Sequence, residues 1–470
     1  ETGKKEGCMV EKAYQRINSF LTTAKKLAGS LVLLSVFLNC GTARAISLIS
    51  DEETEIFLHQ TLRPVFNAAG VAFRPGQIYI VNDRELNAFV TDGNRMFVNI
   101  GTITAADSQN ELTGVLAHET GHIQGGHILR HKIKSREVQS ISLASMLVGG
   151  LAGIAAGRAD LSIAAILGSQ SSALNSMLSY QISEERSADE AAVNLLKKIN
   201  QSPAGMLAFL KKIQHRNKMQ GIAERDYYRT HPLTDERISF VEKAARESRA
   251  PAQGPQEKEF QRIKAKLFAY TEEPRQTFLK YPPNDNSVPA RYARAIALFK
   301  QLKMKEALAE VNSLIADEPQ NPYFYELKGQ MMMETGKIVP AAAAYRQALK
   351  LQPASSLFKL NLSQAMLENN PGQADLKEIV RMLNQVLVYN PDSYAWLLLA
   401  RASGMQNDMA TSNYAAAEFS FLGGDAQTAR RQAENALRHN PSSTLRLKID
   451  DLLMRIKQLE KEEGLPERRR

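Results

Sequence analysis

The sequence contains very little cysteine. Its 470 residues include two cysteines, Cys8 and Cys40, and both lie within the first 45 residues. Without that segment, no disulfide can stabilise the chain and no thiol can act as a nucleophile. The sequence therefore excludes a disulfide-rich scaffold and a cysteine-dependent enzyme.

A large charge of one sign is also lacking. The formal net charge is +9, but the first 45 residues hold seven lysines and arginines against three acidic residues, an excess of four that leaves +5 for the remainder. No stripe of basic residues is interleaved with aromatic ones, so we expect no nucleic-acid partner. The hydrophobic fraction of 44% and the charged fraction of 23% are typical of a globular protein, long enough here for two or three domains.

Long apolar runs are scarce as well. The run Leu27–Leu38 has 12 residues, too few to span a bilayer. Two lysines precede it, and Ala43-Arg44-Ala45 follows with the small residues that a cleavage site needs. We therefore predict a signal peptide over residues 1–45, with residues 1–8 as an extension ahead of the first methionine. The mature protein is then expected in the periplasm.

What the sequence does contain is the run His118-Glu119-Thr120-Gly121-His122. Histidines four residues apart share a helix face, so both imidazoles can bind one zinc ion, and the glutamate between them can act as general base. Ser108 and Glu111 form a capping box that predicts the helix start, and Gly121 allows another element to approach closely. The alternative is a chance match on an ordinary helix. A third ligand decides between the two.

A candidate third ligand stands in the run Glu184-Glu185-Arg186-Ser187-Ala188-Asp189. In proteins with this histidine motif, a glutamate on a later helix commonly completes the metal site. Asp189 lies four residues after Glu185, on the same helix face, where it can accept the second N–H of a ligating histidine. By itself, such a string is more often the solvated face of a helix.

A further histidine, His231, precedes Pro232 in the run Arg229-Thr230-His231-Pro232. Because proline disfavours a helical residue before it, we expect an extended or turn conformation there. His231 can then donate to a developing oxyanion or occupy the fourth position on the metal. A solvent-facing histidine ahead of the next helix is the alternative.

The segment before the histidine motif combines a helix with a small sheet. Residues 51–70 have helical apolar spacing, and Pro64 within them is expected to kink or split that helix. Three β-prone runs follow, and the turn Asp92-Gly93-Asn94 predicts a hairpin between the last two. A sheet edge near the metal is suited to pairing with an extended substrate; a purely structural sheet is the alternative.

Residues 141–174 are rich in alanine, glycine, serine, leucine and isoleucine, and residues 140–157 carry no charge. This composition suggests a membrane span. The stretch is glycine-rich and of marginal length, and charged residues follow it closely. We expect helices that cover the active site, as a mobile lid, rather than a span.

Taken together, these motifs resemble the gluzincin family of the CAAX prenyl endopeptidase and the bacterial HtpX proteases. The resemblance covers residues 51–245 and includes Asn87-Ala88-Phe89, the HETGH run, EERSAD and RTHPLTDERI. It implies one Zn²⁺ per chain held by His118, His122 and Glu185, with Glu119 as catalytic base. It also implies that His231 can bind the metal and keep the enzyme latent. Where the family often has Ser-Arg before the glutamate ligand, this chain has Gln181-Ile182.

The C-terminal half differs in character. Residues 249–258 are polar with two prolines and indicate a domain boundary. From residue 288 the chain is alanine-rich, and Pro319 and Pro353 lie 34 residues apart, which is the tetratricopeptide period. Within this unit the small, aromatic and helix-ending residues stand at the expected offsets: Gly329, Ala341, Tyr345, Ala348 and Pro353. We predict about four irregular repeats, with a generic helical bundle as the alternative.

The expected architecture is an α+β zincin (gluzincin) protease domain, mostly helical with a small sheet, followed by an all-α tetratricopeptide-like solenoid. The predicted parts are a signal peptide (1–45), the protease domain (46–248), a linker with one helix (249–287), the repeats (288–450) and a charged tail (451–470).

The family resemblance implies a periplasmic zinc endopeptidase that degrades unfolded or misassembled proteins, among them outer-membrane β-barrel proteins. It also implies contact with the outer-membrane barrel assembly machinery and is compatible with peripheral membrane association. The alternative is a periplasmic chaperone or assembly factor with latent protease activity.

Overall fold

The computed structural model describes residues 47–74, 76–130, 133–134, 159–220, 231–389 and 392–462. The predicted signal peptide and residues 141–158 of the predicted lid lie outside these ranges. No helix in the described ranges combines the length and apolarity needed to cross a membrane.

A four-stranded sheet lies in the N-terminal part, in the order β1-β2-β4-β3. Its strands are β1 (Leu48–Ile49), β2 (Ile78–Val81), β3 (Ala88–Thr91) and β4 (Arg95–Asn99). Strand β2 runs parallel to β4, and β3 pairs antiparallel with β4 as a hairpin, which confirms the predicted turn. Gly93 and Asn94 adopt positive φ angles of 78° and 58° in that turn, as tight hairpin connections require.

The helices of this part are α2 (Glu52–Ala69), α3 (Ile100–Ala105), α4 (Gln109–Gln124), α6 (Ala159–Lys198), α7 (Ala204–Gln220) and α9 (Asp235–Glu247). Helix α2 passes through Pro64 without the predicted split. Its buried residues Leu58, Leu62 and Phe66 join the core beneath the sheet. The packing of this apolar face holds the helix together across the missing proline hydrogen bond.

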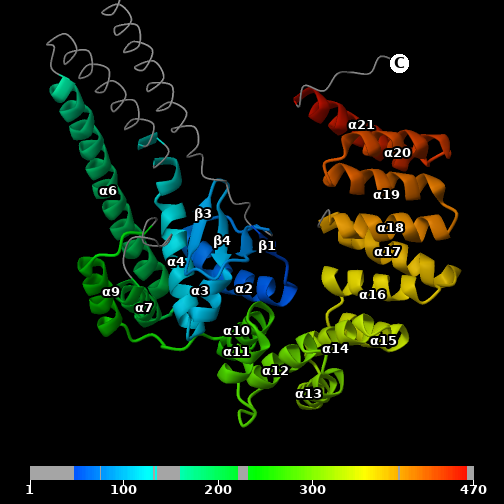
Figure 1. The fold of residues 1–470 in the computed structure, drawn as a ribbon, viewed down its shortest axis with the longest axis horizontal. Helices are drawn as coiled ribbons and strands as arrows, with labels where there is room; N and C mark the ends of the chain where they lie inside the picture. Colours follow the sequence, from blue (N-terminus) through cyan, green and yellow to red (C-terminus); the bar gives the residue numbers. More distant parts are fainter. Residues whose placement is uncertain are drawn as a thin grey trace, which may run out of the picture. The chain divides into compact units, whose positions relative to one another are not determined.

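Helix α4 occupies the centre of this part, between the sheet and α6 and α7 (Figure 1). Fourteen of its residues, Gln109 to His122, are buried. Ser108 caps it by accepting a hydrogen bond from the Glu111 backbone N–H at 3.2 Å, which confirms the predicted start. Because these residues are shielded from water, a polar side chain among them that lacks a protein partner marks a candidate functional group.

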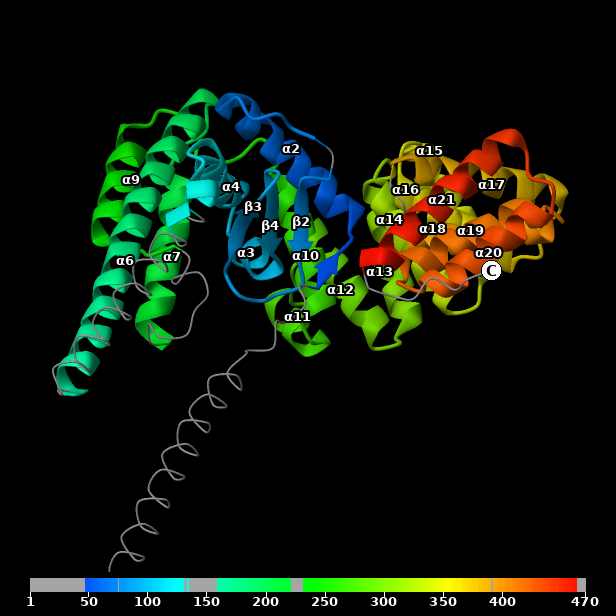
Figure 2. The ribbon, with the colours of Figure 1, turned by 90° about the horizontal axis from the view of Figure 1, so that it is seen from above.

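The remaining helices follow the predicted boundary near residue 249. They are α10 (Glu257–Thr271), α11 (Pro274–Lys280), α12 (Val288–Lys300), α13 (Met304–Asp317), α14 (Pro322–Glu334), α15 (Ile338–Leu351), α16 (Ser356–Glu368), α17 (Gln373–Tyr389), α18 (Ser393–Met405), α19 (Met409–Leu422), α20 (Ala426–Arg438) and α21 (Ser443–Glu462). From α12 onward, sequence neighbours pack as successive pairs in a solenoid (Figures 1 and 2). Tyr345 lies over Gly329, as tetratricopeptide packing requires: a β-carbon on that glycine would come within 2.5 Å of the ring.

The number of repeats was underestimated, because five helix pairs lie between α12 and α21 in the described residues. Prolines follow the first three pairs, whereas the pair α18–α19 ends at Gly423-Gly424, with Gly424 at a φ of 82°. Helix α21 also extends into the predicted charged tail, where Leu452 and Ile456 are buried. Residues 463–470 lie outside the described ranges.

The segment predicted as a linker holds two helices, and α10 is shared between two cores. On one side Phe260, Ile263 and Leu267 pack into the core beneath the sheet. On the other side Ala265 and Ala269 pack with the first repeats. Because α10 packs into both cores, the segment predicted as a linker is a structural element and not a flexible tether.

Polar contacts reinforce this connection at the first turn of α2. The Glu52 carboxylate accepts hydrogen bonds from the Ser355 hydroxyl at 2.6 Å and from the Leu357 backbone N–H at 2.9 Å, at the start of α16. The buried Lys266 of α10 lies 3.1 Å from the Glu53 carboxylate. A carboxylate at a helix N-terminus is favourably placed, because the free N–H groups there point toward it.

Candidate metal centre

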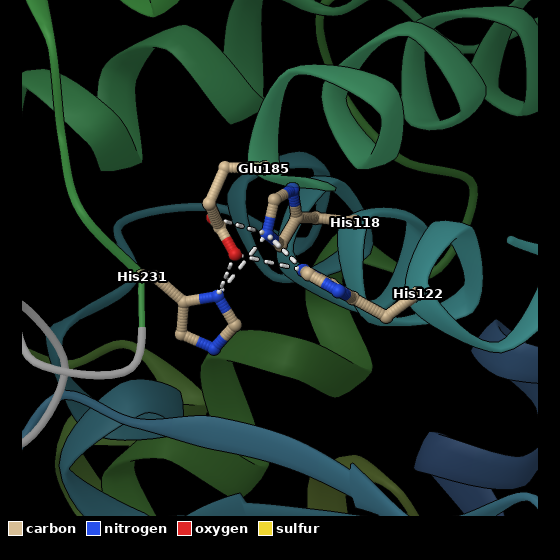
Figure 3. A group of neighbouring side chains, drawn as sticks. All are labelled: His118, His122, Glu185 and His231. Carbon is tan, nitrogen blue, oxygen red and sulfur yellow. Dashed lines mark hydrogen bonds and ion pairs between the residues drawn. The ribbon is translucent and has the colours of Figure 1, made fainter. Parts of the chain in front are cut away.

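Helix α4 brings two histidines to one side at its buried C-terminal half. His118 is 3% exposed and His122 is 9% exposed, and their Nε2 atoms lie 3.1 Å apart. This follows from their spacing of four residues on one helix. Both ring nitrogens point toward the same point in space, so two of the predicted ligands are in position (Figure 3).

Helix α6 brings the predicted glutamate to the same point. The Glu185 carboxylate lies 3.3 Å from His118 Nε2 through Oε2 and 3.1 Å from His122 Nε2 through Oε1. The approach depends on Gly121, because a β-carbon there would lie 2.6 Å from the carbonyl oxygen of Ala188. The glycine in the histidine motif therefore sets the distance at which α6 packs on α4.

His231 completes the group from the non-helical segment before α9. Its Nδ1 lies 3.0 Å from Glu185 Oε1 and 3.4 Å from His118 Nε2, and the side chain is 5% exposed. The non-helical conformation expected ahead of Pro232 is confirmed. Figure 3 shows the four side chains of this metal cluster, His118, His122, Glu185 and His231, converging from three separate segments.

Most donor separations in the metal cluster are close to those of a tetrahedral ion. Four ligands at about 2.0–2.1 Å from one zinc ion lie roughly 3.3 Å from one another. Five of the six pairs of residues have donor contacts of 3.0 to 3.4 Å, with Glu185 facing His118 through Oε2 and the other two histidines through Oε1. One ligand atom from each of the four residues lies within 4.8 Å of the others. Three imidazoles and a carboxylate are donors that Zn²⁺ prefers. The four groups, all buried, could hold one metal ion.

Glu119 lies beside the metal cluster with unsatisfied oxygens. It is 1% exposed, and neither carboxylate oxygen has a hydrogen-bond partner among the described residues. Its Oε1 is 3.6 Å from His231 Nε2. Burial raises the pKa of Glu119, against the opposing influence of His231 and His118. A buried carboxylate that lacks partners is poised to accept a proton or a water molecule.

Asp189 is placed as predicted, one turn beyond Glu185. Its Oδ1 lies 2.9 Å from His118 Nδ1, on the opposite side of that ring from the metal cluster. This contact lets the carboxylate accept the Nδ1 proton, so that His118 keeps the Nε2 lone pair for a metal. Burial would raise the pKa of Asp189, but the charge of Arg237 and hydrogen bonds with His118 and Arg237 lower it.

Arg237, on α9, was not predicted as a site residue. Its guanidinium contacts Asp189 through two hydrogen bonds of 2.6 and 2.9 Å and lies 2.8 Å from Glu185 Oε2. It also donates to the carbonyl oxygen of Pro232 at 2.8 Å. Arg237 therefore places a positive charge against both buried carboxylates. The sequence signal that could have identified Arg237 was its place in the RTHPLTDERI run, one of the motifs that carry the family resemblance.

His127 is the second residue that the sequence analysis missed. It is 2% exposed, and its Nδ1 lies 2.9 Å from Nδ1 of His122. Burial lowers the pKa of His127 to about 4, and the charge of Arg130 adds to this. Its spacing of five residues from His122 is unlike the helical spacing of the motif, so periodicity did not single it out.

These features of the site define a class of enzyme. A buried pair of motif histidines, a glutamate from a later helix and a buried carboxylate beside them are the arrangement of a metallopeptidase of the zincin type. Residues 52–245 match the family model described as Peptidase family M48. Over these residues the chain is similar to Peptidase family M48, and together with the geometry of the site this makes the chain a metalloendopeptidase.

Relatives extend the likeness to most of the chain. The Beta-barrel assembly-enhancing protease of Yersinia pestis is 26% identical over 73% of this chain and 71% of its own length. The protein of that name from Escherichia coli (strain K12) is 24% identical over 80% of this chain and 77% of its own length. The chain therefore resembles the beta-barrel assembly-enhancing proteases in both of its halves.

The repeats also have a likeness among solved structures. A tetratricopeptide-repeat protein of Thermus thermophilus is 17% identical and covers 34% of this chain and 95% of its own, with a TM-score of 0.23. A score of this size does not establish a shared fold. The solenoid is established by its own helix pairs and their buried small residues.

Proposed function

We propose that this protein is a zinc-dependent endopeptidase of the periplasm that degrades misfolded or misassembled proteins. The observation that carries the proposal is the buried metal cluster with Glu119 beside it. Zinc is the preferred ion because the donor set is rich in imidazole and most of the donor separations suit tetrahedral geometry. His118, His122 and Glu185 would hold it, with Asp189 orienting His118.

The reaction assigned to these residues is hydrolysis of a peptide bond. A bound zinc ion would polarise the scissile carbonyl and make a water molecule more acidic. Glu119 accepts a proton from the attacking water as the water oxygen bonds to the carbonyl carbon. The same carboxyl then delivers that proton to the leaving nitrogen as the C–N bond breaks. The raised pKa of Glu119 favours this exchange.

His231 is proposed to keep the site latent. Its Nδ1 lies at the corner that a substrate or water would need, within 3.4 Å of His118 Nε2. The earlier alternative, donation to the oxyanion, requires His231 to move from this corner. Because His231 lies in a non-helical segment, apart from the two helices that carry the other three ligands, such a movement would leave those ligands in place.

The role of the repeats and the substrate class belong to the same proposal. The relatives' names associate those proteins with β-barrel assembly. We extend this to outer-membrane β-barrel substrates and to contact with their assembly machinery here. The solenoid would recruit the substrate or partner, since stacked helix pairs present an extended binding surface. The predicted signal peptide supports a periplasmic location.

A second function from another class is a periplasmic chaperone or assembly factor in which proteolysis stays latent. The position of His231 against the other ligands favours the chaperone function if His231 never leaves the metal cluster. In that case a Glu119→Gln protein would still support barrel assembly in cells.

Hydrolysis of casein by residues 46–470 tests the proposal, with Glu119→Gln and His231→Ala beside the wild type. We expect cleavage by His231→Ala, weaker cleavage by the wild type and none by Glu119→Gln. Faster cleavage by His231→Ala would show that this histidine gates a competent site. Zinc binding without cleavage by any of the three proteins would favour the chaperone function.

A further inference from the structure

A buried histidine outside the metal cluster contacts one of its members. His127 follows α4, where Gly126 takes a positive φ of 64° and turns the chain back over the helix end. The rings of His127 and His122 meet edge to face, with centroids 4.9 Å apart. Their Nδ1 atoms are 2.9 Å apart, which is a hydrogen-bond distance.

The direction of this hydrogen bond follows from the orientation of His122. Its Nε2 faces His118 Nε2 and the Glu185 carboxylate, so Nε2 must carry the lone pair if the residue binds a metal. The proton of a neutral His122 is then on Nδ1. In that tautomer the N–H donates to Nδ1 of His127, and the proton of His127 is on Nε2, a buried nitrogen with no hydrogen-bond partner among the described residues.

The two ligand histidines thus have different supports. His118 contacts the Asp189 carboxylate through its Nδ1, whereas His122 contacts a neutral imidazole through its Nδ1. Gly125 keeps the second support in place, because a β-carbon there would lie 2.2 Å from Nε2 of His127. The glycine at position 125 therefore leaves the room that the His127 ring needs to reach His122.

We infer that His127 is a positioning residue for the metal: it fixes the ring orientation and the Nε2 lone pair of His122. The inference rests on the proposed function, since it concerns the zinc ion that the metal cluster would hold. Partners of this kind that orient a ligating histidine typically change metal affinity by about 10- to 100-fold when removed.

The test is the equilibrium affinity of the full chain for Zn²⁺, measured by competition with a chelator. Asn places an oxygen where His127 has Nδ1, Gln places it further out, and Leu offers no acceptor. We expect His127→Asn to stay within a few-fold of the wild type, while His127→Leu and His127→Gln lose about 10- to 100-fold. His59→Leu, which removes a histidine from α2 outside the metal cluster, should change nothing.

Two further results keep the test decisive. The Co²⁺-substituted proteins should show a changed visible spectrum in His127→Leu but not in His127→Asn, because ligand geometry determines that spectrum. If His127→Leu fails to fold, as judged by circular dichroism, the Asn–Gln comparison carries the test. Equal zinc affinity for wild type and His127→Leu, or for Asn and Gln, overturns the inference. A wild-type protein that binds no zinc overturns the proposed function as well.

Discussion

At the residue scale, the metal cluster depends on charges that balance one another in a buried space. Glu185 and Asp189 are both almost fully buried, and Arg237 contacts both of them. Burial would raise the pKa of Glu185, but the charges of His231 and His118 hold it well below its usual range. The carboxylates therefore stay ionised, as a metal ligand and its supporting residue must.

Removing the guanidinium should destabilise the fold markedly. In Arg237→Met, Asp189 loses two hydrogen bonds and both carboxylates lose a buried positive charge. Breaking such a buried pair from one side costs about 3–5 kcal/mol. We expect a loss of this size in the free energy of urea unfolding of the metal-free protein.

Arg246→Met, which changes an exposed arginine on the same helix, is the matched control and should cost less than about 1 kcal/mol. Equal losses in the two variants would show that Arg237 acts as an ordinary surface charge.

At the element scale, the site depends on how closely two helices approach. Two glycines lie where α4 packs closely against its neighbours. Gly114 lies against Met206 of α7, and Gly121 lies against Ala188 of α6. The second contact positions Glu185 and Asp189, which both lie on α6. The separation of the two helices is therefore part of the geometry of the metal cluster.

Gly121→Ala should weaken both stability and metal binding. Alanine favours a helix over glycine by about 1 kcal/mol, but its methyl group would meet a backbone carbonyl oxygen at 2.6 Å. Backbone cannot rotate away as a side chain can, so α6 must move. We expect a net loss of about 1–3 kcal/mol in unfolding free energy, with zinc affinity reduced at least about tenfold.

Gly372→Ala serves as the control, because the nearest atom to its β-carbon is a side-chain oxygen at 3.8 Å. A Gly121→Ala protein with wild-type zinc affinity would show that the helix spacing tolerates a methyl group.

At the scale of the whole molecule, α10 connects the protease part with the repeats. Phe260, Ile263 and Leu267 are buried against the protease core, a contribution of roughly 5–9 kcal/mol for three such side chains. This is comparable with the total stability of a typical domain. A protease domain without α10 would expose the corresponding apolar surface.

A fragment of residues 46–248 should therefore fail to unfold cooperatively, whereas residues 46–286, which retain α10 and α11, should show a cooperative transition. Thermal melts followed by circular dichroism distinguish the two. Similar melting temperatures for both fragments would mean that the predicted boundary at residue 248 is the true edge of the domain.

Much of the metal cluster was predictable because its signals are local. Helix spacing determines that His118 and His122 share a face, and a serine with a glutamate three residues later marks the start of α4. Glu185 and His231 were predicted from chemistry and from family resemblance, without any spacing that linked them to α4. The structure brings all four together, while their catalytic and metal-binding roles stay proposals.

The residues that were missed depend on packing. An arginine in the first turn of a helix is usually exposed to solvent, and only the seating of α9 against α6 buries Arg237 beside two carboxylates. His127 lies close to the motif in sequence, but the turn at Gly125 and Gly126 decides that its ring returns to His122. Neither contact has a local periodic pattern.

The sequence by itself determined the protein class, the helix that carries the histidine motif, the hairpin before it, and the repeat character of the C-terminal half. These properties depend on backbone preferences and spacings within a few residues or one repeat. Tertiary structure alone decided the shared role of α10, the five helix pairs of the described residues, and the supports given by Arg237 and His127. They depend on which surfaces meet across long stretches of chain, and those contacts are fixed only when the core is packed.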